Sequence, residues 1–176
     1  MRYVKYVVLL LILAGVSVSV LWVGVFRAQE EHRFAFEEFR ILPLRIHMLK
    51  SSRVPDLDTQ STDDDIIRVL AKINGIWNQA GVQFFLHSLV REEVVNDFVY
   101  TGFKRGVPLP MLGLLRPRES QAGGMFHVYY VHDFHVNGVF IPGVAIFVKE
   151  LSELKEIEDG IDEPMARVTA HELGHG

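Results

Sequence analysis

The first 26 residues constrain the fold of this chain most, because they hold an uninterrupted apolar segment. Arg2 and Lys5 come first, and residues 6–26 then carry no charge. About 20 apolar residues in a helix span the hydrocarbon core of a bilayer, whereas the apolar region of a signal peptide has about 7–15. No polar face interrupts the run, as it would in a buried helix of a water-soluble domain. We predict a cytoplasmic n-region over residues 1–5 and a transmembrane signal anchor over residues 6–26.

A cleaved signal peptide is the alternative, with the small residues 17–19 as the cleavage site. Cleavage there would leave the apolar residues 20–26 exposed at the new N-terminus, which favours the anchor. Arg2 and Lys5 place the N-terminus in the cytoplasm by the positive-inside rule. The remaining chain is then expected outside the cytoplasm, held at the cell membrane by a single span, or secreted if the N-terminus is cleaved.

Composition excludes several classes of site. The chain has no cysteine, which removes disulfides, thiolate metal sites and cysteine nucleophiles together. The net charge of −4 and the lack of a Lys/Arg cluster argue against a nucleic-acid partner. The length of 176 residues suits one domain and a tail. We expect residues 27–40 to be a juxtamembrane linker and residues 41–176 to form the domain.

Two neighbouring segments carry the clearest local patterns. Residues 41–50 alternate apolar and polar side chains, which predicts a strand with His47 on its solvent face. Residues 61–81 predict a helix, because Thr62 and Asp65 match a capping box and the apolar residues that follow recur with the helical period. The acidic run that contains Asp65 could also suggest a cation site, but a helix cap explains it with fewer assumptions.

The rest of the chain adds further strands and a closing helix. We expect a short helical turn at 110–120, strands at 82–90, 125–134 and 143–151, and a helix from about Asp162 with Pro164 in its first turn. Residues 91–124 otherwise give no clear pattern. The order of elements predicts an α/β (α+β) domain with a mostly parallel mixed sheet covered by helices.

The final ten residues, RVTAHELGHG, hold the motif that carries chemistry. His171 and His175 are four residues apart, which on an α-helix is a rotation of about 400° and places both rings on one face. Two imidazoles so placed can bind one Zn²⁺. Glu172 is rotated by about 100° and can reach a water on the open side of the metal, as a general base does. Only three positions are fixed, so the motif can also arise by chance.

The sequence HELGHG resembles the opening of the metzincin signature, H-E-x-x-H-x-x-G-x-x-H. VTAHELGHG is similar to the active-site helix of matrixin-type members, and INGIWNQAGVQFFL to the first helix and second strand of bacterial matrixin-like domains. The resemblance covers roughly residues 40–176 and implies a twisted sheet with two long helices, the N-terminal subdomain of that clan. It implies a zinc endopeptidase with His171 and His175 as ligands and Glu172 as catalytic base. An edge strand in NGVFIPG that pairs with extended peptide substrate is also implied.

The third ligand of the clan is a histidine six residues after the second motif histidine, which here falls beyond Gly176. We therefore expect this chain to be an inactive fragment of a longer peptidase, because two imidazoles hold zinc weakly. Two alternatives stay open: a zinc peptidase with a downstream glutamate as third ligand, and a non-catalytic, membrane-tethered binding module.

Three further histidines lie close together in FHVYYVHDFH. Period-two alternation places His127 and His135 on one side of the predicted strand and His132 on the other. Their spacing does not reproduce the additional structural zinc site of matrixins. We expect these three to be ordinary strand and loop histidines.

Overall fold

The computed structural model describes residues 38–103, 109–118, 121, 123–151 and 163–176. The chain divides into two compact units, residues 1–36 and 37–176, and the description concerns the second. The predicted n-region, signal anchor and nearly all of the predicted linker lie outside the described residues. Within the described part, no helix combines the length and apolarity that a membrane span needs.

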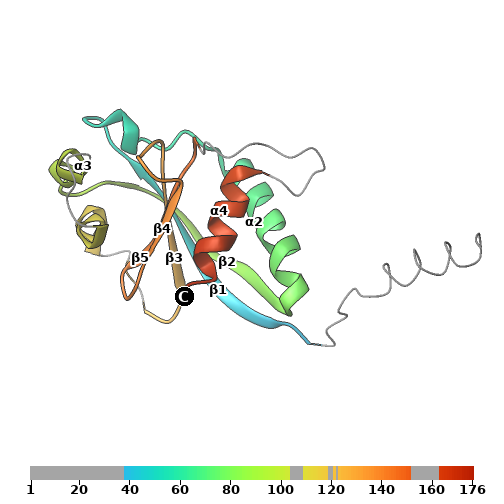
Figure 1. The fold of residues 1–176 in the computed structure, drawn as a ribbon. Coiled ribbons are helices and arrows are strands. Elements are labelled where there is room, and N and C mark those ends of the chain that lie inside the picture. The colour runs from blue at the N-terminus through green and yellow to red at the C-terminus, as the bar shows by residue number, and fades with distance from the viewer. Residues whose placement is uncertain (1–37, 104–108, 119–120, 122, 152–162) are drawn as a thin grey trace, which may run out of the picture. The chain divides into compact units, whose positions relative to one another are not determined.

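A five-stranded sheet forms the centre of the domain, with the strand order β2-β1-β3-β5-β4 (Figure 1). All neighbouring strands run parallel except β4, which pairs antiparallel with β5 at one edge. The predicted mixed, mostly parallel sheet is therefore confirmed. The strands are β1 (Arg40–Lys50), β2 (Val82–Glu93), β3 (Phe126–Val131), β4 (Gly138–Ile141) and β5 (Ala145–Lys149).

Helices cover both faces of this sheet. The two longest, α2 and α4, lie side by side on one face, and the short segments α3 and η3 lie on the other (Figure 1). The helical segments are η1 (Pro55–Leu57), α2 (Asp63–Trp77), η2 (Asn78–Ala80), α3 (Phe98–Phe103), η3 (Leu109–Leu115) and α4 (Pro164–Leu173). The turn predicted at 110–120 is η3, whereas α3 falls in the stretch without a clear sequence pattern.

The capping box of α2 forms as predicted. The Thr62 hydroxyl accepts a hydrogen bond from the Asp65 N–H at 3.2 Å, and the Thr62 N–H donates to the Asp65 carboxylate at 2.8 Å. The hydrogen bonds from Thr62 to the ionised carboxylate hold the pKa of Asp65 at about 2. At the other end, Gly81 has a φ of 69°, the left-handed conformation that ends such helices at glycine.

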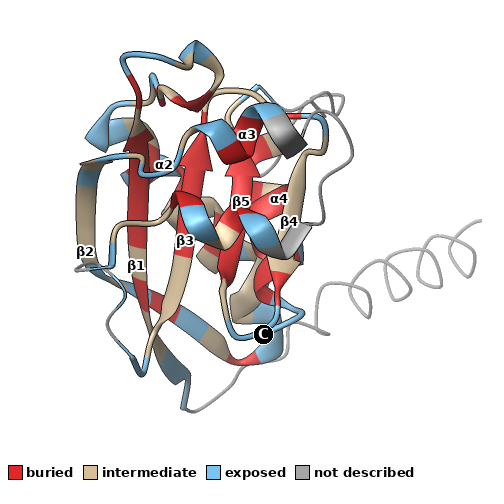
Figure 2. Cartoon of the chain, turned by 90° about the vertical axis from the view of Figure 1, so that its left-hand side faces the viewer, coloured by how far each residue is buried: buried red, intermediate tan, exposed pale blue. Residues whose placement is uncertain are grey.

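The expectation that His47 faces solvent is wrong. His47 is fully buried on the face of β1 that α3 and η3 cover. The parallel sheet is covered on both faces, so alternation along β1 separates two buried environments rather than core and solvent. Figure 2 shows the result, with buried residues concentrated on the three central strands β1, β3 and β5.

Helix α4 presents small residues to the sheet. Pro164 is in its first turn, as predicted, and Ala166, Ala170 and Leu173 are buried against the sheet. An ion pair ties its start to α2, because Arg68 contacts the carboxylate of Glu163 at 3.0 Å. This helix carries the histidine pair at its C-terminal end.

Candidate functional site

The two motif histidines meet at the exposed C-terminal end of α4. Their Nε2 atoms are 3.3 Å apart, and the rings are nearly perpendicular, at 84°. Two nitrogen ligands at about 2.0–2.1 Å from a tetrahedral zinc ion lie about 3.3–3.4 Å apart. The spacing of His171 and His175 therefore fits two adjacent positions of one tetrahedral ion.

The backbone around the pair differs slightly from the predicted α-helix. The regular helix ends at Leu173, and the N–H groups of Gly174 and His175 donate to the carbonyls three residues earlier. Such bonds are typical of a 3₁₀ turn, which often tightens the last turn of a helix. The two imidazoles nevertheless share one face.

Trp77, the last residue of α2, fixes the position of this turn. Its indole N–H donates to the Ala170 carbonyl at 3.1 Å. The ring lies against Gly174, where an added Cβ would come within 3.3 Å of Trp77 Cζ2. Gly174 is therefore explained by close contact with the indole and not by a left-handed backbone, since its φ is −73°.

The Glu172 side chain lies against the sheet edge. Glu172 is only 9% exposed. An added Cβ at Gly138, the first residue of β4, would lie 3.2 Å from Glu172 Oε1 and 3.0 Å from Glu172 Cγ. Glycine at this position gives the carboxylate room between α4 and the edge strand.

A pocket of about 710 Å³ adjoins this arrangement. His171 and Glu172 lie on its wall together with Trp77 and Gly138. The acid and one imidazole therefore face a shared space that is large enough for several residues of a peptide.

Strand β4 lies at the sheet edge beside the pair. Phe140 of β4 stacks near His175, with ring centroids 6.2 Å apart and an angle of 24° between the planes. The segment NGVFIPG thus contains an antiparallel edge strand next to the candidate site.

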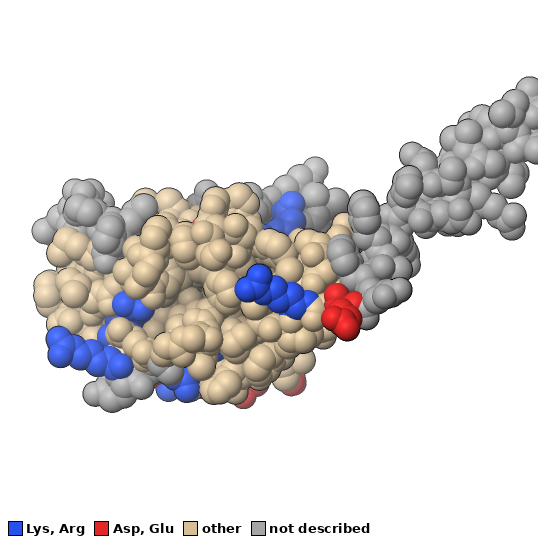
Figure 3. Space-filling view, turned by 90° about the horizontal axis from the view of Figure 1, so that it is seen from below, with Lys and Arg blue, Asp and Glu red and all other residues tan. Residues whose placement is uncertain are grey.

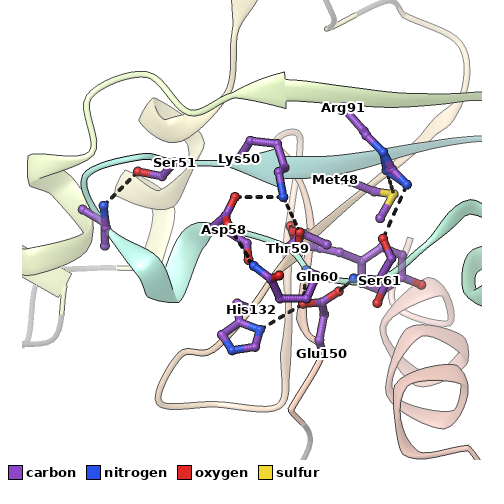
Figure 4. A network of polar contacts seen from close by, with 12 residues as sticks. Met48, Lys50, Ser51, Asp58, Thr59, Gln60, Ser61, Arg91, His132 and Glu150 are labelled. Carbon is purple, nitrogen blue, oxygen red and sulfur yellow. Dashed lines mark hydrogen bonds and ion pairs between the residues drawn. The ribbon is translucent and has the colours of Figure 1, made fainter.

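His132 and His135, two of the three histidines in FHVYYVHDFH, have other partners than the pair of His171 and His175. His132 Nδ1 lies 3.2 Å from the Glu150 carboxylate, and Glu150 also accepts backbone N–H bonds from Gln60 and Ser61 (Figure 4). This network ties the loop after β1 to the end of β5. His135 packs edge-on against the Phe134 ring. Within the described ranges, no group of three or more His, Asp or Glu side chains is arranged to hold a metal.

His127 belongs to a buried chain of polar groups that the sequence analysis missed. Its Nδ1 lies 2.9 Å from His47 Nε2, and His47 Nδ1 lies 2.7 Å from the Glu92 carboxylate. Tyr129 stacks on His47 with ring centroids 4.0 Å apart. The alternation places His47 and His127 on the polar sides of their strands, but only the register of β1 against β3 brings them together.

Burial lowers the pKa of His47, against the opposing effect of its hydrogen bond to Glu92. The neutral ring has one N–H, which is best used toward the carboxylate at Nδ1. Its Nε2 then accepts a hydrogen bond from the Nδ1–H of His127. The polar chain therefore fixes the orientation of the His127 ring.

Comparison with known proteins leaves the geometry as the main evidence. No protein-family model matches the chain, and a search of curated proteins finds no match.

Proposed function

We propose that the chain carries the zinc-binding helix of a metzincin-type endopeptidase, anchored in the cell membrane with its domain outside the cytoplasm. The observation that carries the proposal is the 3.3 Å separation of the His171 and His175 Nε2 atoms, which suits a tetrahedral zinc ion. The membrane location rests on the apolar segment at residues 6–26 alone.

The residues at this site have complementary roles in the proposal. His171 and His175 would hold the zinc, which when bound would acidify a water and polarise the scissile carbonyl. Glu172 would take a proton from the attacking water and return it to the leaving amine. The edge strand β4 would pair with an extended peptide, so the substrate class is peptide or protein.

A catalytic zinc site needs a third protein ligand. In the proposal this is the histidine that the metzincin resemblance places six residues after His175. The 176-residue chain alone would then bind zinc weakly and show little peptidase activity. Robust proteolysis by the 176 residues alone that a chelator abolishes would contradict the need for a third protein ligand.

Zinc binding by the purified 176-residue chain tests the proposal directly. We expect one zinc ion per chain, and at least about tenfold weaker binding in His171→Ala, because one of two ligands is lost. Glu172→Gln is the matched control and should bind zinc like the wild type. Equal zinc affinity in the wild type and His171→Ala would overturn the proposal.

The alternatives separate in a version of the chain that extends past Gly176. A histidine ligand shortly after this position supports the metzincin reading, and a distant glutamate ligand supports the other class of zinc peptidase. If the extended chain holds one zinc ion but cleaves peptides no better than its Glu172→Ala variant, the proposed peptidase activity is wrong.

A further inference from the structure

A second pocket, of about 360 Å³, opens where β3 begins and β4 turns into β5. Its polar wall is formed by Arg116, Gln121 and His127, and its apolar wall includes Phe126, Phe140 and Val144. None of its described lining residues is acidic. From below, toward the end of the domain where β3 begins, Figure 3 shows scattered basic side chains on a mostly uncharged surface.

Arg116 is held in a fixed position in this wall. Its Nε donates to the Gly113 carbonyl at 3.2 Å, and its Nη1 donates to the carbonyl of Val144. The guanidinium carbon also lies 5.8 Å from the centre of the Tyr129 ring, within cation–π range. The fork geometry of a guanidinium matches a carboxylate, and a fixed fork loses little conformational entropy on binding.

His127 supplies a second polar group with a fixed orientation. The chain from Glu92 through His47 engages its Nδ1, so the imidazole cannot rotate without breaking a buried hydrogen bond. The pocket thus offers a guanidinium in a partly apolar setting, where a carboxylate is bound more strongly than in water.

The pocket lies next to the histidine pair. Phe140 lines the pocket and also stacks on His175, with centroids 6.2 Å apart. Phe126 lines the pocket too, and Gly176 packs directly against its ring. An extended peptide advances about 3.3 Å per residue, so the 6.2 Å between the Phe140 and His175 rings corresponds to about two residues of a peptide bound along this edge.

We propose that this second pocket binds an acidic side chain, Glu or Asp, of a peptide substrate within three residues of the cleaved bond. The Arg116 guanidinium recognises the carboxylate, and Phe126 and Phe140 contact the methylene groups. The claim that this side chain lies near the cleaved bond rests on the proposed function. The binding of the carboxylate depends only on the described pocket.

Matched peptides test the pocket on the full 176-residue chain. The probes are blocked pentapeptides of alanine with one Glu, moved through each position, and the same peptides with Gln. Calorimetric titration with zinc present should give at least about tenfold tighter binding of one Glu peptide than of its Gln partner, as expected for a charge-assisted hydrogen bond. Equal affinity at every position overturns the inference.

Three variants locate the effect. Arg116→Gln should remove the preference for Glu, and Gln121→Glu, which adds a negative charge at an exposed residue of the pocket wall, should weaken it. Arg118→Gln is the matched control, because Arg118 is exposed and does not line the pocket. Loss of the preference in Arg118→Gln as well as Arg116→Gln would overturn the pocket as its source.

The zinc measurements keep the two proposals apart. Normal zinc binding without a Glu preference overturns the acidic pocket and leaves the proposed function standing. A Glu preference in a wild-type chain that binds no zinc supports the pocket and contradicts the zinc site.

Discussion

The two faces of the sheet are buried in different ways. On the face under α2 and α4, the central strands contribute apolar side chains such as Ile46, Val128 and Val148. On the face under α3 and η3, the same strands contribute His47 and Tyr129 beside apolar neighbours. Apolar contact dominates the first face, which also holds a buried hydrogen bond between the Tyr130 and Thr169 hydroxyls at 2.9 Å. The second face differs in that it buries an imidazole bonded to a carboxylate.

This difference has consequences for stability. Burial of apolar area stabilises a fold without regard to direction or pH. The stabilisation from a buried imidazole that bonds to a carboxylate depends on direction and on pH. Protonation changes which ring nitrogens can donate, and it raises the free-energy cost of burying the ring. We therefore expect the face under α2 and α4 to supply most of the stability, and the face under α3 and η3 to supply its pH dependence.

The largest effect on stability is expected from Ile46→Ala on the face under α2 and α4. Ile46 is fully buried among the residues under α2 and α4. Loss of its side chain should lower the free energy of unfolding by about 2–5 kcal/mol, measured by urea denaturation. Ile67→Ala is the matched control, since Ile67 is 57% exposed. A loss below about 1 kcal/mol for Ile46→Ala would contradict the assignment of the main core to this face.

Gly138→Ala tests how closely α4 approaches the sheet edge. The added Cβ would meet Val168 Cγ1 and lie 3.0 Å from Glu172 Cγ. We expect overpacking to cost about 1–3 kcal/mol, seen as a lower urea midpoint. Gly123→Ala, where an added Cβ meets nothing within 4 Å, should be neutral. Equal stability of the two variants would show that the contact is looser than described.

The pH dependence of stability should originate on the opposite face. His47 has a lowered pKa in the folded chain, so below the unfolded value of 6.5 only the unfolded chain takes up this proton. Its contribution is complete above pH 6.5 and is lost as the pH falls toward the folded pKa. We expect His47→Gln to reduce the decline by up to about 1.4 kcal/mol per pH unit, measured by urea denaturation from pH 5 to 8.

Ile46→Ala serves as the control for this slope. It should shift the whole stability curve downward and leave its pH dependence unchanged. If His47→Gln instead lowers stability equally at every pH, the buried imidazole contributes only packing and hydrogen bonding.

The smallest effect on stability is expected at the exposed start of α2. Thr62→Ala removes the oxygen that accepts the Asp65 N–H. The cost should be about 1 kcal/mol by urea denaturation. Ser52→Ala, at another exposed loop position, should change stability by less than about 0.5 kcal/mol. If Thr62→Ala leaves the free energy of unfolding unchanged, water replaces the Thr62 hydroxyl as the acceptor of the Asp65 N–H.

Prediction from sequence succeeded where the contacts are local. The Thr62–Asp65 cap spans three residues, and the pair of His171 and His175 spans four. Within a helix such spacings fix the relative direction of side chains before any tertiary contact forms. Alternation likewise identified β1, but it did not reveal that both of its faces are buried.

The long-range contacts could not be read in this way. His47 and His127 are 80 residues apart, and Trp77 and Ala170 are 93 apart. The crossover connections between parallel strands leave their register open in the sequence. The segment that covers the second face, α3 and η3, carries no strong periodic pattern, so the burial of His47 was missed.

The sequence by itself determined the types of the longer elements, because their apolar residues recur with a helical or strand period. It also determined the helix cap and the relative placement of the two imidazoles, because helix geometry sets both over one turn. Only the tertiary structure decided what surrounds these elements. It placed Gly138 beneath Glu172, Trp77 against Gly174, and His127 beside His47. Each of these contacts depends on strand register and helix packing, which arise from burial summed over the whole domain and not from any single segment.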